Sequence, residues 1–253
     1  MVRALCEDAL YASRHLRGAP GFTAVAIVTL ALGIGATIAM FSLVDALLFR
    51  ELPITDPQGL IGITGRGREG QLRLTPIPAI AELSRDDSPL QNLCAYNGGV
   101  VIAVKANGEP TQAVGALVSG RCFEAFGVAP IVGRVISDED APLMSAGNHV
   151  AVLSHRFWRR MFGEDASAVG KPIAVEGIAL TIIGVLPAGF GGLQVDAGVD
   201  IFTPFDTVFP ARTDRRPAAA QILGRLRPGI SLDQAAARLS TMWPAVLQVA
   251  VPS

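Results

Sequence analysis

The stretch FTAVAIVTLALGIGATIAMFSLVDALLF, residues Phe22–Phe49, decides the fold of this chain of 253 residues. No residue from Phe22 to Val44 carries a charge. At about 1.5 Å of rise per residue, this run makes roughly 35 Å of helix, enough to cross a hydrocarbon core of about 30 Å. A buried core helix would show a polar stripe, and the apolar region of a signal peptide spans only about 7 to 15 residues. The sequence therefore predicts one transmembrane helix over residues 20–49.

Within this helix, small residues recur at every fourth position: Ala31, Gly35 and Ala39. Such spacing leaves a smooth face where the backbone of another helix can approach closely. Ordinary composition is the alternative explanation, because Gly and Ala are common in membrane helices. We expect this face to pack against a partner helix.

The basic residues beside the span indicate its orientation. Arg3, Arg14 and Arg17 precede it, whereas Arg50 is the only basic residue in the fifteen or so that follow. Short cytoplasmic flanks carry the excess of Lys and Arg, and long translocated segments do not count toward it. The sequence therefore predicts a cytoplasmic N-terminus and a main domain, residues 50–253, outside the cytoplasm.

Residues 1–19 precede the span and predict a short amphipathic helix on the cytoplasmic membrane surface. Its apolar side is formed by Leu5, Ala9, Ala12 and Leu16. The helix could dock a cytoplasmic partner, or it could serve only as a basic flank that sets the topology. Composition alone leaves both open.

Charge and cysteine content exclude some classes of function. The net charge is −1 and the chain has no dense Lys/Arg run, which argues against a nucleic-acid partner. The three cysteines are Cys6, Cys94 and Cys122. A Cys94–Cys122 disulfide is possible, but an odd count without dense spacing favours two buried thiols.

The main domain has the pattern of an α+β fold, in which strands and hairpins outnumber helices. Asn107-Gly108 and Glu176-Gly177 are turn pairs that predict two β-hairpins. The short apolar run 201–203 predicts an edge strand.

Helix ends are also marked in the sequence. Ser154 and Gly163 bracket a predicted helix whose inward residues include Phe157 and Trp158. Ser231 with Gln234 forms a capping box that opens a helix through about Met242.

Candidate chemical motifs do not assemble into a site. Residues 65–70 match G-x-G-x-x-G, but the chain continues as a predicted strand and then proline, whereas dinucleotide binding requires a helix there. His149 and His155 lack the spacing of metal ligands, and Ser137–Asp140 reads as a solvated turn or a helix cap rather than a calcium loop. We therefore expect no enzyme, no cofactor and no metal ion.

Five stretches, in this order and spacing, resemble the FtsX-type permeases of ABC transporters that carry a MacB-like periplasmic core domain and lack a fused ATPase. They are PGFTAVAIVTLALGIGATIAMFSLVDALLFRELP (20–53), VSGRCFEAFGVAPIVGR (118–134), VAVLSHRFWRRMFG (150–163), VGKPIAVEGIALTIIGVLPAGFGG (169–192) and GRLRPGISLDQAAARL (224–239).

The resemblance implies a protein of the bacterial inner membrane in which a first transmembrane helix is followed by a two-lobed mixed α/β periplasmic core domain; the sequence itself predicts a single pass. One lobe would be split between about 50–120 and 221–243, and the other, about 121–220, would be inserted. It also implies a cytoplasmic ABC-type ATPase as partner, pairing as a homodimer or with another permease half, and an output of export or envelope signalling.

The chain departs from this family pattern at its C-terminal end. Family permeases continue into three further transmembrane helices, whereas this sequence ends at WPAVLQVAVPS without a second long apolar run. We therefore expect a truncated or split permease. The alternative is a solitary membrane-anchored periplasmic binding or scaffold domain without transport activity.

Overall fold

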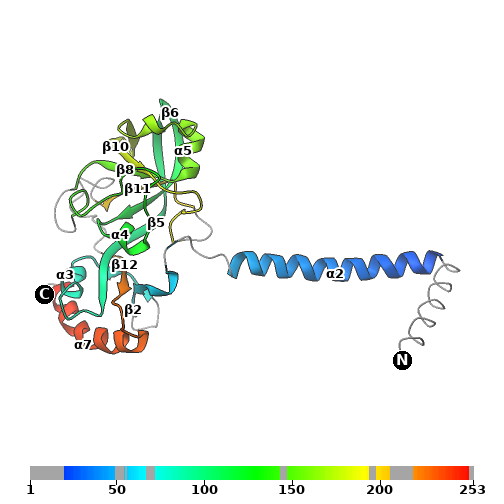
Figure 1. The fold of residues 1–253 in the computed structure, drawn as a ribbon, viewed down its shortest axis with the longest axis horizontal. Coiled ribbons are helices and arrows are strands. Elements are labelled where there is room, and N and C mark those ends of the chain that lie inside the picture. Colours follow the sequence, from blue (N-terminus) through cyan, green and yellow to red (C-terminus); the bar gives the residue numbers. More distant parts are fainter. Residues whose placement is uncertain are drawn as a thin grey trace. The chain divides into compact units, whose positions relative to one another are not determined.

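The computed structural model describes residues 20–48, 54, 56–66, 72–142, 147–193, 198–205 and 219–250. The chain divides into two compact units, Met1–Glu51 and Leu52–Ser253. The first unit contains the apolar helix and the second contains the sheet and the remaining helices (Figure 1). The amphipathic helix expected over 1–19 lies outside the described residues.

The apolar stretch forms one helix, α2 (Pro20–Leu48), as predicted. Two of its threonine side chains bond within the helix: the hydroxyls of Thr29 and Thr37 each donate to the backbone carbonyl four residues earlier, both at 2.8 Å. The part Pro20–Ser42 is long and apolar enough to cross a membrane, and none of it is buried. Unmet hydrogen bonds are costly in hydrocarbon, so these internal bonds suit a lipid environment.

The second unit is built on one ten-stranded sheet and a separate pair of short strands. The strands are β1 (Leu60–Ile63), β2 (Gly65–Arg66), β3 (Leu72–Arg73), β4 (Thr75–Pro76), β5 (Leu90–Ala106), β6 (Glu109–Val118), β7 (Val132–Gly133), β8 (Val150–Leu153), β9 (Pro172–Val175), β10 (Ile178–Val185), β11 (Ile201–Pro204) and β12 (Ala219–Leu226). The helices are α3 (Ala79–Leu83), α4 (Cys122–Phe126), α5 (His155–Phe162) and α7 (Leu232–Ala250), with 3-10 turns at Pro57–Gly59 and Ala166–Ala168.

Part of the sheet closes on itself. Strands β5, β6, β11, β8, β10 and β9 pair in this order, and β9 pairs again with β5, at Val104 opposite Val175. At this seam the backbone NH of Glu176 donates to the Ala103 carbonyl at 2.9 Å, and a Glu176 carboxylate oxygen accepts from the Ala103 NH at 2.6 Å. We call this closed part the barrel. Its core includes Ile102, Leu153, Ile173, Leu180 and Ile182, together with Phe157 and Trp158 of α5.

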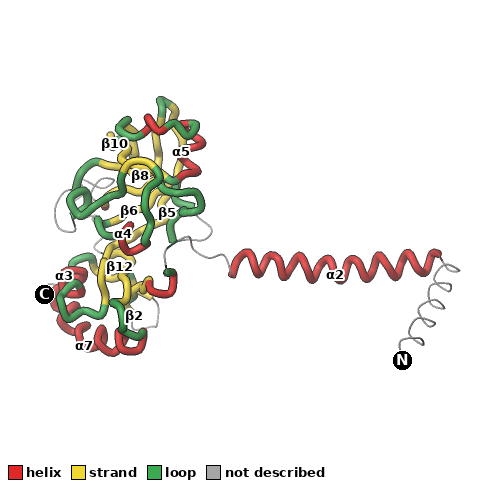
Figure 2. The backbone as a smooth tube through the Cα atoms, viewed as in Figure 1, coloured by secondary structure: helices red, strands yellow, loops and turns green. Residues whose placement is uncertain are grey.

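The other part of the sheet carries two helices. Strands β1, β12, β4 and the first half of β5 form its framework, and α3 and α7 contact each other there. Figure 2 shows these two helices at the opposite end of this unit from α5. We call this part the helical end. Its core is formed by Ile63, Ala79, Ile80, Leu83, Leu90, Leu93, Ala95, Ala220, Ile222 and Val246.

Strand β5 is 17 residues long and belongs to both parts. Its first half, Leu90–Tyr96, pairs with β12, and its second half pairs with β9. Between the halves, the register with β6 shifts between Gly98 and Val100, and Gly99 has a φ of 83°. Only glycine adopts this backbone conformation readily, so the bulge accounts for Gly99, whereas a Cβ atom on Gly98 would collide with the side chain of Tyr96.

Several local predictions are confirmed. Both predicted hairpins form, with positive φ at Asn107-Gly108 and at Glu176-Gly177. The Ser154 hydroxyl accepts from the Phe157 NH at 3.2 Å, and α5 ends at Gly163 with a φ of 60°.

Two predictions about the secondary-structure elements are wrong. Strand β11 is not an edge strand, because it lies between β6 and β8 with all of its residues buried. Helix α7 continues past Met242 to Ala250 although Pro244 lies within it. Val246 is buried in the core of the helical end and Trp243 packs against it, which explains why the helix persists.

Candidate functional site: the apolar helix and the centre of the sheet

The predicted packing face lies on one side of α2. Ala31, Gly35 and Ala39 are exposed, and a Cβ atom placed on Gly35 would find no heavy atom outside its own helix within 4 Å. Successive small residues four apart share one helical face. The face is therefore open among the described residues, and its packing against a partner stays a prediction.

A second feature lies in the centre of the folded unit, beneath α4. One face of β12, β5, β6, β11 and β8 is buried there, on the side of the sheet opposite the two cores already described. We call these residues the central cluster: Ile54, Cys94, Tyr96, Ala116, Val118, Cys122, Phe123, Ala125, Phe126, Val128, Ile136, Ala141, Val150, Val152, Leu186, Phe190, Val199, Phe202 and Leu223. Figure 1 shows α4 between the barrel and the helical end.

Aromatic rings dominate the central cluster. Phe123 of α4 contacts Phe202 of β11 with ring centroids 5.6 Å apart, and Phe126 contacts Tyr96 of β5 at 5.8 Å. Phe190 stacks on Phe202 at 5.8 Å. Burial raises the pKa of the Tyr96 hydroxyl. Edge-to-face and offset pairs of this kind stabilise a core beyond the area that they bury, so α4 is held firmly against the sheet.

A disulfide joins Cys94 of β5 to Cys122 of α4, with Cα atoms 5.1 Å apart. Both residues are fully buried. The expectation of two buried thiols is therefore wrong. The two cysteines are 28 residues apart, and they meet because the β5–β6 hairpin returns the chain and α4 folds back over the first half of β5.

Hydrogen bonds hold α4 and the turn before it from two sides. The Ser119 NH donates to the Ala95 carbonyl at 3.0 Å, and the Ser119 hydroxyl accepts from the Ala95 NH at 2.9 Å. From β12, Arg225 Nε donates to the Ala125 carbonyl at 2.7 Å. Strand β5 and strand β12 thus both bind the segment that carries α4.

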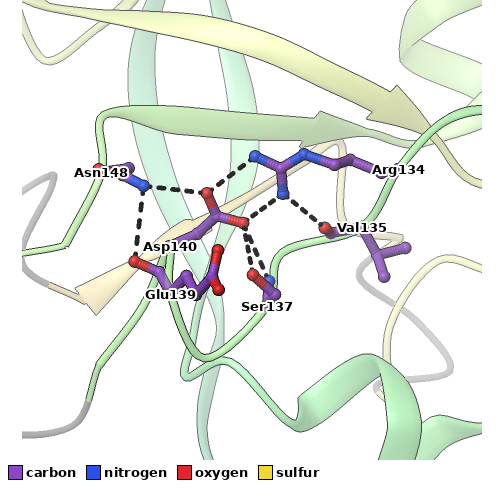
Figure 3. A network of polar contacts seen from close by, with 6 residues as sticks. All are labelled: Arg134, Val135, Ser137, Glu139, Asp140 and Asn148. Carbon is purple, nitrogen blue, oxygen red and sulfur yellow. Dashed lines mark hydrogen bonds and ion pairs between the residues drawn. The ribbon is translucent and has the colours of Figure 1, made fainter.

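Asp140 is the centre of a buried polar network (Figure 3). Its carboxylate accepts from both Nη atoms of Arg134, one at 2.9 Å, from the Ser137 NH and hydroxyl at 3.1 and 3.0 Å, and from Asn148 Nδ2 at 3.2 Å. The Arg134 guanidinium, followed by the other donors, holds the pKa of Asp140 well below its usual range. The interpretation of Ser137–Asp140 as a solvated turn is wrong for Asp140, which is 1% exposed.

A second buried carboxylate, Asp200, was not identified from the sequence. It accepts from Arg156 at 2.8 Å and from the Val114 NH at 3.1 Å, and Arg160 lies 3.6 Å away. Arg156 and Arg160 are one helical turn apart on α5, which places them on one face. That spacing was the only available signal, because Asp200 is 40 residues or more from both in the sequence.

The described residues contain no group of three His, Cys, Asp or Glu side chains that could hold a metal ion. His155 instead lies edge-on to Trp158, with centroids 5.6 Å apart. At the G-x-G-x-x-G match, β2 pairs with β3 across residues 67–71, which lie outside the described part. The two buried carboxylates, Asp140 and Asp200, have a structural role, because their hydrogen bonds hold neighbouring loops and strands together.

A family model matches most of the chain. The family model described as MacB-like periplasmic core domain matches residues 23–242. No curated protein matches the chain.

Solved structures share the fold. The periplasmic region of MacB from Actinobacillus actinomycetemcomitans is 16% identical, with a TM-score of 0.57 over 74% of this chain and 83% of that one. The extracellular domain of the noncanonic ABC-type transporter YknZ from Gram-positive bacteria is 15% identical, with a TM-score of 0.52 over 71% and 88%. A domain described as part of a permease protein from Porphyromonas gingivalis is 19% identical, with a TM-score of 0.53 over 78% and 84%. Because the family model covers most of its length, the chain belongs to the family of MacB-like periplasmic core domains.

Proposed function

We propose that this chain is a permease-type subunit of an ABC transporter. In this proposal α2 crosses the bacterial inner membrane once, the N-terminus lies in the cytoplasm, and Leu52–Ser253 lies in the periplasm. A cytoplasmic ATPase drives motion that α2 transmits to the folded unit, for export or for signalling across the envelope. The observation that carries the proposal is the continuous family match over residues 23–242, which includes both the apolar helix and the folded unit.

Two features support the orientation. Arg3, Arg14 and Arg17 precede the span, as expected of a cytoplasmic flank. The Cys94–Cys122 disulfide lies C-terminal to the span, in the part of the chain that this proposal assigns to the periplasm. Disulfides persist in oxidising compartments such as the periplasm and are rare in the cytosol.

The proposed subunit has no catalytic role of its own. Its buried carboxylates at Asp140 and Asp200 are held by arginines and backbone donors of the same fold. Such fully bonded groups are poor nucleophiles and poor bases. Energy would therefore come from the ATPase partner.

Pairing in the membrane would use the face of α2 formed by Ala31, Gly35 and Ala39, called the small face, either with a second copy or with another permease half. Outside the membrane, the expected split lobe (about 50–120 and 221–243) and inserted lobe (about 121–220) would form the moving domain. The separate cores of the barrel and of the helical end support two lobes. Strands β5 and β6, however, contribute residues on the N-terminal side of 121 to the barrel core.

The test is affinity purification of the tagged full chain from detergent-solubilised membranes, followed by mass spectrometry. We expect an ABC-type ATPase, or a polypeptide with further membrane helices, to be recovered with it. A matched purification of an unrelated single-pass protein at the same expression level sets the background. Recovery of the correctly inserted, folded chain alone would instead favour a solitary anchored scaffold.

A further inference from the structure

Strand β5 contains a point at which the folded unit could bend. The bulge at Gly98-Gly99 lies after the last β5 residue paired with β12, Tyr96, and before the first paired with β9, Val104. Bulges bend strands, and glycine offers little steric resistance to a change of backbone angle. Strand β5, which runs through both parts, thus has at their junction a bulge where its backbone can bend.

Helix α4 bridges this junction. Its disulfide is anchored at Cys94, four residues before Gly98, on the half of β5 that belongs to the helical end. The ring of Phe123 reaches Phe202 of β11, a strand of the barrel. The same short helix is therefore fixed covalently on one side of the bulge and packed against aromatic residues on the other.

The central cluster contains residues from both the helical end and the barrel, so many side chains besides those of α4 connect the two parts. Leu223 comes from β12, whereas Val152 comes from β8, and both belong to this one buried group. Arg225 adds a polar bond from β12 to the Ala125 carbonyl. A close-packed interior transmits displacement instead of absorbing it, so bending at the bulge would have to break this packing.

We propose that α4, stapled by Cys94–Cys122, is a lock across the Gly98-Gly99 bulge that makes the barrel and the helical end move as one lever. The use of such a lever rests on the proposed function, but the lock itself does not. Both sulfur atoms belong to fully buried residues, so soluble thiols cannot reach the bond in the folded unit. The staple is therefore permanent and does not serve as a redox switch.

Distance measurement by electron spin resonance tests the lock in the full chain in lipid nanodiscs. Spin labels are attached at Glu109→Cys, an exposed position at the start of β6 in the barrel, and at Ala236→Cys, on an exposed position of α7. Cys6→Ser removes the remaining thiol. We expect one narrow distance distribution. A broad or two-peaked distribution in this otherwise native chain would overturn the proposal.

The lock variant is Cys94→Ala with Cys122→Ala, for which we expect the distribution to widen about twofold. Ile182→Val is the matched control, because it trims a buried residue of the barrel core and leaves the central cluster intact. Its distribution should stay narrow. An equally narrow distribution in the folded lock variant would refute the lock.

Phe126→Leu keeps the disulfide and loosens only the aromatic packing, so it decides the matter if the lock variant does not fold. We expect it to widen the distribution by a smaller factor, and an unchanged width would count against the lock. These outcomes are separate from the proposed function, because ATPase recovery is a different measurement. A narrow distribution without ATPase recovery would leave the lock standing and reject the transporter role.

Discussion

Replacing Asp140 by Asn tests the buried network of Figure 3 most directly. The change keeps the shape of the side chain and removes its charge. The carboxylate accepts from Arg134, Ser137 and Asn148, and it is 1% exposed. A net hydrogen bond to a charged group contributes about 1.5 to 3 kcal/mol, and several are weakened together.

Two considerations limit the loss of unfolding free energy in Asp140→Asn. The Arg134 side chain is 55% exposed and can return to water, so its ion pair is screened. The new amide still accepts one or two of the bonds. We therefore expect the free energy of unfolding to fall by about 2 kcal/mol, which lowers the midpoint of a unit this size by roughly 4 to 8 °C.

The assay is thermal and urea unfolding of the full chain in detergent, followed by the fluorescence of Trp158 and Trp243. Asp138→Asn is the matched control in the same loop. Its pair with Arg121 is exposed on both sides, so we expect a change below about 0.5 kcal/mol. If the Asp140 and Asp138 variants lose equal stability, the reasoning about burial fails.

The dependence on pH has a definite sign. The pKa of Asp140 is depressed in the folded state, whereas an unfolded Asp has a pKa of about 3.9. The stabilisation is fully present above that unfolded value and is lost as the pH falls through the folded pKa. The difference in unfolding free energy between the native chain and Asp140→Asn should be constant from about pH 5 to 7 and shrink below about pH 4. A difference that grows on acidification would contradict this assignment.

Three further predictions concern the disulfide, Asp200 and the membrane helix. Cys94→Ser with Cys122→Ser should lower the unfolding free energy, measured by urea titration, by about 3 to 4 kcal/mol, because the bond closes a loop with a sequence separation of 28. A loss below about 1 kcal/mol would mean that packing alone holds α4. Asp200→Asn should cost about 2 kcal/mol, whereas Asp86→Asn, at an exposed position after α3, should cost almost nothing in the same titration. Replacing Ala31, Gly35 and Ala39 with Leu should reduce the yield of cross-linked pairs of the chain in membranes several-fold. The control on the opposite face, with Gly33→Leu, Thr37→Leu and Met40→Leu, should leave that yield unchanged. Equal effects would remove the case for a specific face.

Local signals in the sequence predict much of the fold. The turn pairs Asn107-Gly108 and Glu176-Gly177 require positive φ, and few other residue pairs allow it without strain. The capping box is present, with the Ser231 NH donating to Gln234 Oε1 at 3.1 Å. Each of these features depends only on residues close in the chain, which explains why it can be read from the sequence.

Features that depend on distant residues escaped prediction. The position of β11 between β6 and β8 is set by pairing partners far away in the chain. The partners of Asp200 lie on α5 and β6, and the two disulfide cysteines meet only after α4 has folded over β5. For the candidate site, the sequence predicts the small face of α2, which stays a prediction, but it does not reveal the central cluster.

The pairing of β5 also determines when the folded unit can form. Its partners β9 and β12 begin only at Pro172 and Ala219, so the seam and the helical end both wait for residues far downstream. Contacts this distant in sequence make folding slow. If this unit crossed the membrane starting from β1, the apolar face of β5 would stay exposed until β12, the last strand, emerged. The unit's maturation should therefore depend on holding chaperones during delivery, more than that of a domain built from local hairpins.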